Sequence, residues 1–316
     1  MPLTRFPNGV FATPNLGGEG AYAGWFGTHV WFVDGTNGRD GNVGTDTTKP
    51  FKTIQKAINS ASAQDTIYIN TMAPTSDTSE PGQYIEDLTI AYGKDGLKLI
   101  GVGGTQELMT FGGPKIKNAT ATALLTVNAS NVLIQGLEFN CTRNSGTYGI
   151  KLAGDVAGYS TQGGSCGTHI VNCYFKNSST TYGAIYIYGG YGCLVSRCTF
   201  QLGDIGVWID SNTTPGNGHT IEYCDFKANN GAAVAKHIYV YGSCDDITIK
   251  GCTFGIATKF LIVSGAATGL ISDCYFADTV ATLANSTGKV QVPSTQAVKV
   301  TGCWGGVSLA VIQSAA

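Results

Sequence analysis

The chain repeats one eight-residue pattern seven times, and this repeat restricts its possible folds more than any other feature. The aligned segments are VLIQGLEF (132–139), THIVNCYF (168–175), CLVSRCTF (193–200), HTIEYCDF (219–226), ITIKGCTF (247–254), GLISDCYF (269–276) and VKVTGCWG (298–305). The intervals between the aligned phenylalanines vary from 22 to 36 residues. Such variation is expected when loops of different length join one repeated structural unit.

Each repeat contains two apolar sets that are out of phase by one residue. Positions 1 and 3 share one strand face, as Val132 and Ile134 do. Positions 6 and 8 form the second inward set, which predicts two core columns: Cys173, Cys198, Cys224, Cys252 and Cys274, and Phe139, Phe175, Phe200, Phe226, Phe254 and Phe276. Because a slip of one residue turns every side chain to the other face unless the chain bends, a corner is predicted at positions 4 and 5.

Position 5 of the repeat is mostly occupied by residues that tolerate a left-handed backbone. These residues are Gly136, Asn172, Gly251, Asp273 and Gly302. Arg197 and Tyr223 do not fit this pattern, so we expect the corner to vary between coils.

A second apolar strand follows each repeat after a turn, as in AIYIYGG (184–190), GVWID (206–210) and HIYVYG (237–242). Together with the repeats, these strands predict an all-β fold, a single-stranded parallel β-helix of about eight or nine coils, or ~40 Å at ~4.8 Å per coil. An antiparallel β-sandwich is the competing fold, but it does not explain a recurring column of equivalent inward residues.

A helix over about residues 51–63 is predicted from the apolar spacing of Phe51, Ile54 and Ile58, and it would cap the open end of the coils. The run FVDGTNGRDGNVGTDTTKPFKTIQKAINSASAQDTIYI (32–69) resembles the opening of the pectin-lyase-like superfamily. With the repeats, this resemblance covers about residues 30–305. It implies a right-handed parallel β-helix, and the superfamily includes lyases, hydrolases, phage tailspikes and inert structural rods.

Residues 1–30 have a different character from the β-helix domain predicted over 31–316. They are rich in glycine, proline and aromatic residues. The opening LTRFPNGV (3–10) resembles a short N-terminal segment of some bacteriophage virion proteins. The resemblance implies an arm that attaches to the particle through Arg5, Phe6, Asn8, Phe11 and Trp25.

The composition limits the possible partners and the cellular location. Only 13% of residues are charged, the formal net charge is −2, and no basic run occurs, so we expect no nucleic-acid partner. No apolar run approaches the ~20 residues that span a membrane, and the first residues lack an apolar signal core. We therefore expect no membrane partner and no Sec-type export. The resemblance to bacteriophage virion proteins implies assembly in the cytoplasm of a bacterial host, with the virion as final location.

The cysteines and histidines are interpreted as structural. The five column cysteines are expected to be reduced core thiols, and Cys303 to continue their column. Without a Cys-x-x-Cys pair, the sequence does not favour a zinc site. His219 falls at an inward position, whereas His29 and His237 have no evident partner.

Two chemical alternatives were weighed. Calcium could bind an Asp- and Gly-rich loop through Asp40, Asn42 and Asp46, but the loop lacks an acidic residue at position twelve, so we expect a tight turn and no cofactor.

A glycosidase or lyase would need paired carboxylates, for which the outward candidates are Asp204, Asp210, Glu222 and Asp225. No complete polygalacturonase-like or pectate-lyase-like set occurs, and we expect no catalysis.

The most informative outward feature is a ladder of aromatic residues. Alternation turns Tyr186, Tyr188, Trp208, Asp210, Tyr239 and Tyr241 outward on three successive coils. An exposed aromatic row indicates a contact surface, either between subunits of a homotrimer or for sugar rings, although ordinary cross-strand stacking is a third interpretation.

We expect a structural virion protein, a fibre, decoration or tail component; the alternatives are a polysaccharide-degrading tailspike and a non-catalytic binder of host-surface polysaccharide.

Overall fold

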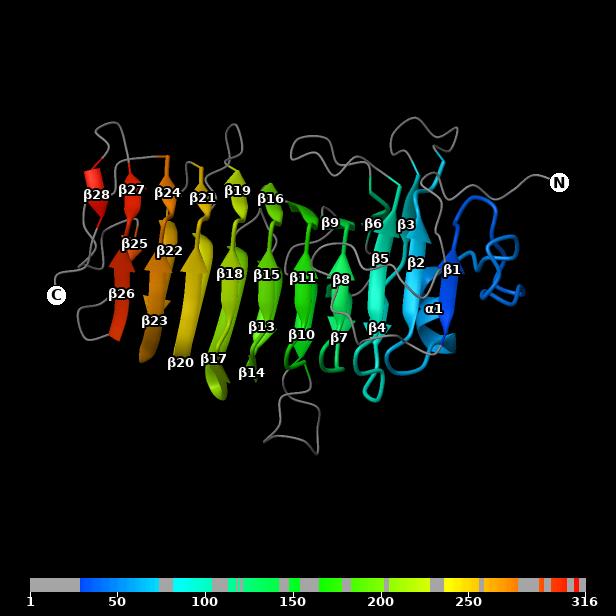
Figure 1. Ribbon diagram of the computed structural model, residues 1–316, viewed down its shortest axis with the longest axis horizontal. Helices are drawn as coiled ribbons and strands as arrows, with labels where there is room; N and C mark the ends of the chain where they lie inside the picture. The colour runs from blue at the N-terminus through cyan, green and yellow to red at the C-terminus, as the bar shows by residue number, and fades with distance from the viewer. Residues whose placement is uncertain are drawn as a thin grey trace.

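The computed structural model is a stack of three-sided coils, arranged in chain order along its long axis (Figure 1). It describes residues 29–73, 82–103, 113–117, 119, 122–141, 148–153, 165–177, 183–201, 205–227, 236–255, 259–277, 290–292, 297–305 and 310–312. All described strand pairings are parallel except that of β27 (Cys303–Gly305) with β28 (Ala310–Ile312). The predicted parallel β-helix is confirmed.

The first side of the coils is formed by the strands that precede each repeat. In spatial order they are β4 (Leu88–Ile90), β7 (Ala123–Val127), β10 (Tyr148–Ala153), β13 (Gly183–Tyr188), the start of β17 (Ile205–Asn217), the start of β20 (Lys236–Lys250), β22 (Lys259–Ser264) and β25 (Val290–Gln291). The short β14 (Gly190–Tyr191) follows β13 and pairs with the end of β17.

The second side carries the first half of each repeat. Its strands are β1 (Val30–Val33), β2 (Thr66–Asn70), β5 (Lys98–Val102), β8 (Leu133–Gln135), β11 (His169–Val171), β15 (Leu194–Ser196), β18 (Thr220–Glu222), the end of β20, β23 (Ala267–Ser272) and β26 (Ala297–Thr301).

The third side carries the second half of each repeat and the phenylalanine column. Its strands are β3 (Gln83–Ile85), β6 (Lys115–Lys117), β9 (Glu138–Cys141), β12 (Tyr174–Asn177), β16 (Thr199–Gln201), β19 (Asp225–Lys227), β21 (Thr253–Phe254), β24 (Tyr275–Phe276), β27 and β28. All six column phenylalanines are buried, and successive rings are stacked with centroids 4.6–5.1 Å apart. The inward frame derived from the repeat is confirmed.

The corner between the second and third sides keeps the same backbone in every repeat. Position 5 has a positive φ not only at glycines but also at Arg197 and Tyr223, both at 52°. The expectation that these two residues change the corner is wrong. The Arg197 N–H donates to Glu222 O at 3.0 Å, and the Tyr223 N–H donates to Lys250 O at 2.9 Å. Stacking on the next coil thus imposes a conformation that these side chains disfavour in isolation.

The column cysteines help to complete the hydrogen bonding of this corner. In one coil the Cys198 Sγ lies 3.5 Å from Ile170 O of the preceding coil and 3.4 Å from Ser196 O of its own coil. No disulfide joins any of the ten cysteines, and all of them except Cys166 are buried. Burial raises the pKa of the Cys198 thiol well above its usual value, so the column is inert packing, as predicted.

The N-terminal end is covered by the one described helix, α1 (Ile54–Ser60), which is shorter than the predicted 51–63. Ile54, Ala57 and Ile58 are buried against the coils. The helix begins late because the N–H groups of Lys52 and Thr53 both donate to Asp40 Oδ1 at 2.9 Å. The Thr53 hydroxyl then caps the helix by accepting from the Lys56 N–H at 3.3 Å.

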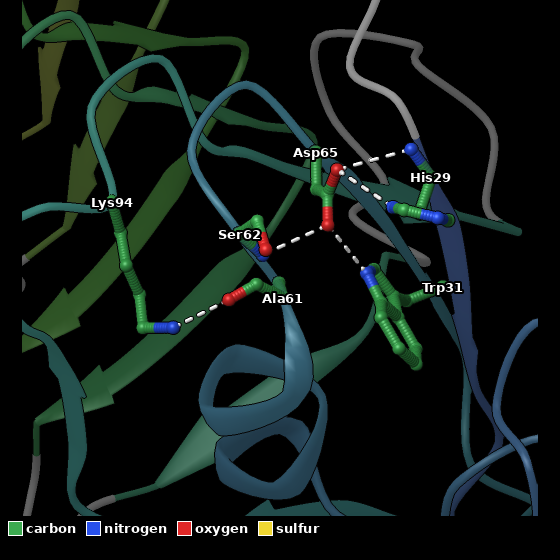
Figure 2. Close-up of polar contacts among 6 residues, drawn as sticks. All are labelled: His29, Trp31, Ala61, Ser62, Asp65 and Lys94. Atoms are coloured by element: carbon green, nitrogen blue, oxygen red, sulfur yellow. Dashed lines mark hydrogen bonds and ion pairs between the residues drawn. The ribbon is translucent and has the colours of Figure 1, made fainter.

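A buried carboxylate fastens the beginning of β1 to this cap, as Figure 2 shows. Asp65 is fully buried and accepts from the His29 N–H at 3.0 Å, the Trp31 indole N–H at 2.9 Å and the Ser62 N–H at 2.8 Å. The His29 ring also lies 3.7 Å from the carboxylate. The expectation that His29 has no partner is therefore wrong.

Candidate functional site

The outer face of the first side carries a group of aromatic residues that we call the aromatic stripe: Tyr148, Tyr186, Tyr188, Trp208, Tyr239 and Tyr241. The alternation places Ile185, Val207 and Ile238 inward, where all are fully buried. In register, Tyr186 pairs with Trp208 and Trp208 with Tyr239, and the neighbouring column runs from Tyr188 through Asp210 to Tyr241. The predicted register of the ladder is confirmed.

The rings of the stripe contact one another across the coils. The Tyr186 and Trp208 ring centroids are 5.0 Å apart in an edge-to-face arrangement, and those of Trp208 and Tyr239 are 5.8 Å apart. Tyr148 was not predicted, yet its ring stacks on Tyr186 at 4.6 Å. Its strand partner is Gly183, which has no side chain, and this glycine is the sequence signal that could have identified it.

The stripe is less exposed than alternation alone indicates. Tyr186 is only 9% exposed, because Tyr148, Tyr188 and Trp208 surround its ring, whereas Tyr241 is 36% exposed. The expectation of a fully exposed row is wrong for Tyr186. Tyr188, Trp208 and Tyr239 are half-buried and present partial ring surfaces.

Charged groups adjoin the stripe on both columns. The Tyr186 hydroxyl donates to Asp210 Oδ2 at 2.9 Å, and burial together with this carboxylate raises the pKa of Tyr186 far above its usual value. The Lys236 ammonium lies 4.2 Å from the Tyr239 ring centroid, a cation–π contact. Lys151 is the strand partner of Tyr186 on the other side from Trp208. The stripe therefore combines ring surfaces with two lysines and one carboxylate that is already hydrogen-bonded.

The carboxylates proposed for catalysis belong to different sides of the coils. Asp210 lies on the first side, Glu222 on the second and Asp225 on the third, while Asp204 lies outside the described residues. Glu222 accepts from the Ser196 hydroxyl at 3.1 Å. Asp225 lies 3.6 Å from the Lys227 ammonium, and burial raises the pKa of Asp225.

Glu138 was not predicted from the sequence. It lies on the third side and is only 6% exposed. Its carboxylate lies 3.8 Å from the Lys115 ammonium, its strand partner, and Tyr174 is its partner on the other coil. Burial raises the pKa of Glu138, and Lys115 opposes this shift. Glu138 occupies the same outward repeat position as Asp225, and this shared position is the signal that could have identified it.

Two histidines are enclosed in the core. Burial lowers the pKa of His219 to about 4, as expected for an inward position. His237 has partners, contrary to expectation: its Nε2 lies 3.0 Å from Gly255 O, and its ring stacks on Phe260. Burial lowers the pKa of His237 to about 4.

The loop considered for calcium uses its oxygen atoms within the protein. Asp40 accepts from the amides that precede α1, and Asp46 accepts from the Thr48 N–H and hydroxyl at 2.8 Å. The Asn42 amide donates to Pro50 O at 2.7 Å. In the described part of the chain, no three His, Cys, Asp or Glu side chains gather closely enough to hold a metal ion.

No helix among the described segments has the length and apolar character needed to cross a membrane.

The three-sided coils and their stacked columns define a parallel β-helix protein. The family model described as "Right handed beta helix region" matches residues 98–255, and the chain belongs to this family. No curated protein sequence matches the chain.

Solved structures resemble the chain in fold. Pectate lyase Pel9A has a TM-score of 0.57 and 11% identity, covering 90% of this chain and 78% of its own. A pectin methylesterase from Aspergillus niger has a TM-score of 0.54 and 15% identity, covering 89% of this chain and 87% of its own. Geobacillus virus E2 ORF18 has a TM-score of 0.48 and 16% identity, and the match covers 87% of this chain and 61% of its own. At these identities the likeness to the pectate lyase and the pectin methylesterase shows the fold alone.

Proposed function

We propose that the chain is a structural protein of a bacteriophage particle, a β-helical fibre, decoration or tail component that makes contacts through the aromatic stripe. The observation that carries this proposal is the continuous row of rings on three successive coils. Aromatic residues dominate the energetics of protein interfaces, and a row fixed by backbone register presents them in one geometry. The resemblance of residues 3–10 to virion segments supports the same class.

The chemistry of the stripe favours contact over catalysis. Asp210, the one carboxylate placed beside the stripe among the described residues, already accepts a hydrogen bond from Tyr186. The other candidate acids in the described residues, Glu222 and Asp225, lie on other sides of the coils. A paired-carboxylate mechanism needs two such groups about 5–9.5 Å apart around one bond. We therefore favour a second copy of this chain, in a homotrimer, as the first partner of the stripe.

Replacing Trp208 by alanine is expected to dissociate the trimer, because it removes the central ring of the stripe. A central aromatic at an interface contributes about 2 kcal/mol or more, so the dissociation constant should rise about 30-fold or more. Analytical ultracentrifugation measures this change, and circular dichroism checks the fold. Trp304→Ala is the matched control, because Trp304 is 45% exposed on the third side. A Trp208→Ala variant that stays trimeric would contradict the interface.

A host-surface polysaccharide is the second candidate partner, and the Lys236 contact with Tyr239 favours it. Half-buried rings beside an ammonium group suit the faces and hydroxyls of sugars. If the wild-type chain is monomeric, binding to isolated host polysaccharide, lost in Trp208→Ala and kept in Trp304→Ala, supports this candidate. Release of reducing ends or unsaturated sugars that stops in Asp210→Asn would instead replace the structural proposal with an enzyme.

Removal of residues 1–28 is expected to abolish incorporation into particles and to leave the β-helix folded. The cut spares His29 and Trp31, whose N–H groups bind Asp65. Removal of residues 1–33 is the comparison: it deletes β1 and should lower the melting temperature as well. Thermal unfolding and particle-bound protein are the two measurements. A chain without residues 1–28 that still enters particles, or that fails to fold, would refute the arm as an attachment segment.

A further inference from the structure

Four buried polar side chains form a group at the bend between the first and second sides, which we call the polar seam: Ser165, Thr168, Ser211 and His219. Among the described residues, the hydroxyl oxygens of Ser165 and Thr168 and both ring nitrogens of His219 have no hydrogen-bond partner, whereas the Ser211 side chain contacts the Cys244 thiol. Such groups are rare in protein interiors, where nearly all buried polar atoms are paired with protein or with ordered water.

The seam spans three successive coils in one register. The residues after Thr168, Cys193 and His219 pair with one another, so these three side chains form one column. Beside them, Gly190 of β14 pairs with Gly216 of β17. The seam residues therefore lie on the first and third of three successive coils, with Cys193 and Gly190 of the middle coil between them.

Three of the four polar residues lie beside the two glycines. A Cβ atom added to Gly216 would lie 2.6 Å from Ser211 Oγ and 2.9 Å from His219 Nε2. A Cβ atom added to Gly190 would have Ser165 Oγ, 3.8 Å away, as its one described neighbour within 4 Å. The Ser211 and His219 atoms thus fill the side-chain position at Gly216, and open space remains at Gly190, beside Ser165.

The seam is neutral, and this restricts the ligand. Burial raises the pKa of the Cys193 thiol to about 12, and its Sγ lies 3.3 Å from Ser165 O. Burial likewise keeps the imidazole of His219 uncharged at neutral pH, since it lowers the pKa to about 4. With no charged partner among the seam residues, an ion would lose its hydration without compensation.

We propose that the polar seam binds ordered water, which bridges the hydroxyls of Ser165, Thr168 and Ser211 and the imidazole of His219 across three coils. A buried water molecule makes about three hydrogen bonds and needs a polar site with room for it. The seam offers both acceptors and donors, because each hydroxyl can do either and the imidazole supplies one of each.

Substitution of Thr168 by valine decides between a hydrated and a dry seam. In a hydrated seam valine removes a bonded hydroxyl, and the folding equilibrium constant should fall about 5-fold or more. In a dry seam, valine has the same shape as threonine but lacks the unsatisfied hydroxyl, so the folding equilibrium constant should rise. Urea unfolding of the full chain measures it, and an unchanged or increased constant overturns the proposal.

Val132→Thr is the matched control, because Val132 precedes Thr168 by one coil in the same column. It adds a hydroxyl beyond the seam and should lower the constant. A direct readout covers the case in which variants fold poorly. Water magnetic relaxation dispersion of the wild-type chain should detect long-lived internal water molecules. The Gly190→Ala variant fills the space at Gly190 with a methyl group, so it should contain fewer of these molecules. Equal numbers in both proteins would refute the site.

Discussion

Truncation of Phe226 to alanine is expected to lower the free energy of unfolding by about 3–5 kcal/mol, the range measured for large-to-small changes of buried aromatic residues. Phe226 is fully buried, and its ring stacks on Phe200 at 4.6 Å and on Phe254 at 5.0 Å. Alanine removes both stacking contacts and leaves a cavity between coils that backbone hydrogen bonds hold at a fixed spacing. Urea unfolding followed by circular dichroism measures the loss.

Two variants test whether the stacked column is the cause. Phe226→Leu keeps most of the volume and should cost about 1 kcal/mol. Tyr275→Ala, at a 45% exposed position on the outer face of the same side, should cost less than about 0.5 kcal/mol. Equal losses in Phe226→Ala and Tyr275→Ala would contradict a column that stabilises the coils.

The inward columns could be predicted because the frame of the repeat records them directly. Residues at one position of the repeat become neighbours in adjacent coils, so Phe200 aligned with Phe226 in the sequence is also in contact with it in the fold. In a solenoid the long-range contacts follow from the alignment of repeats. The same logic correctly aligned Tyr186 with Trp208 in the aromatic stripe.

The left-handed corners at Arg197 and Tyr223 could not be predicted from residue preference. The preference of a single residue disfavours such a backbone by only about 1–2 kcal/mol. Each corner N–H instead bonds a carbonyl of the next coil, and neighbouring coils hold the same bend. The repeated tertiary contacts therefore outweigh the local preference.

The contacts of the candidate site depend on details that alternation does not contain. Alternation assigns Tyr186 to the outer face but does not show that Tyr148 reaches across Gly183 to cover its ring. It also cannot show that Tyr186 donates to Asp210. Ring direction and hydrogen bonds between adjacent coils decide how much of an outward residue remains available for a partner.

Acidification is expected to destabilise the protein through its two buried histidines. Burial lowers the pKa of His219 and of His237 to about 4, below the ordinary 6.5. Between these pH values the unfolded chain binds more protons than the folded one. Stability is therefore complete above pH 6.5 and falls as the pH drops towards 4, by about 3 kcal/mol for each histidine.

Three buried or half-buried carboxyl groups change stability in the opposite direction, so the histidine contribution must be isolated by substitution. Burial raises the pKa of Glu86, Glu138 and Asp225, and these groups gain stability as the pH falls through their folded values. They are unchanged in a His219→Gln, His237→Gln double variant, which has no imidazole to protonate at these positions. The difference in unfolding free energy between wild type and this variant should therefore shift by about 6 kcal/mol between pH 7 and 4. A difference that stays constant over this range would show that neither histidine is held neutral by the fold.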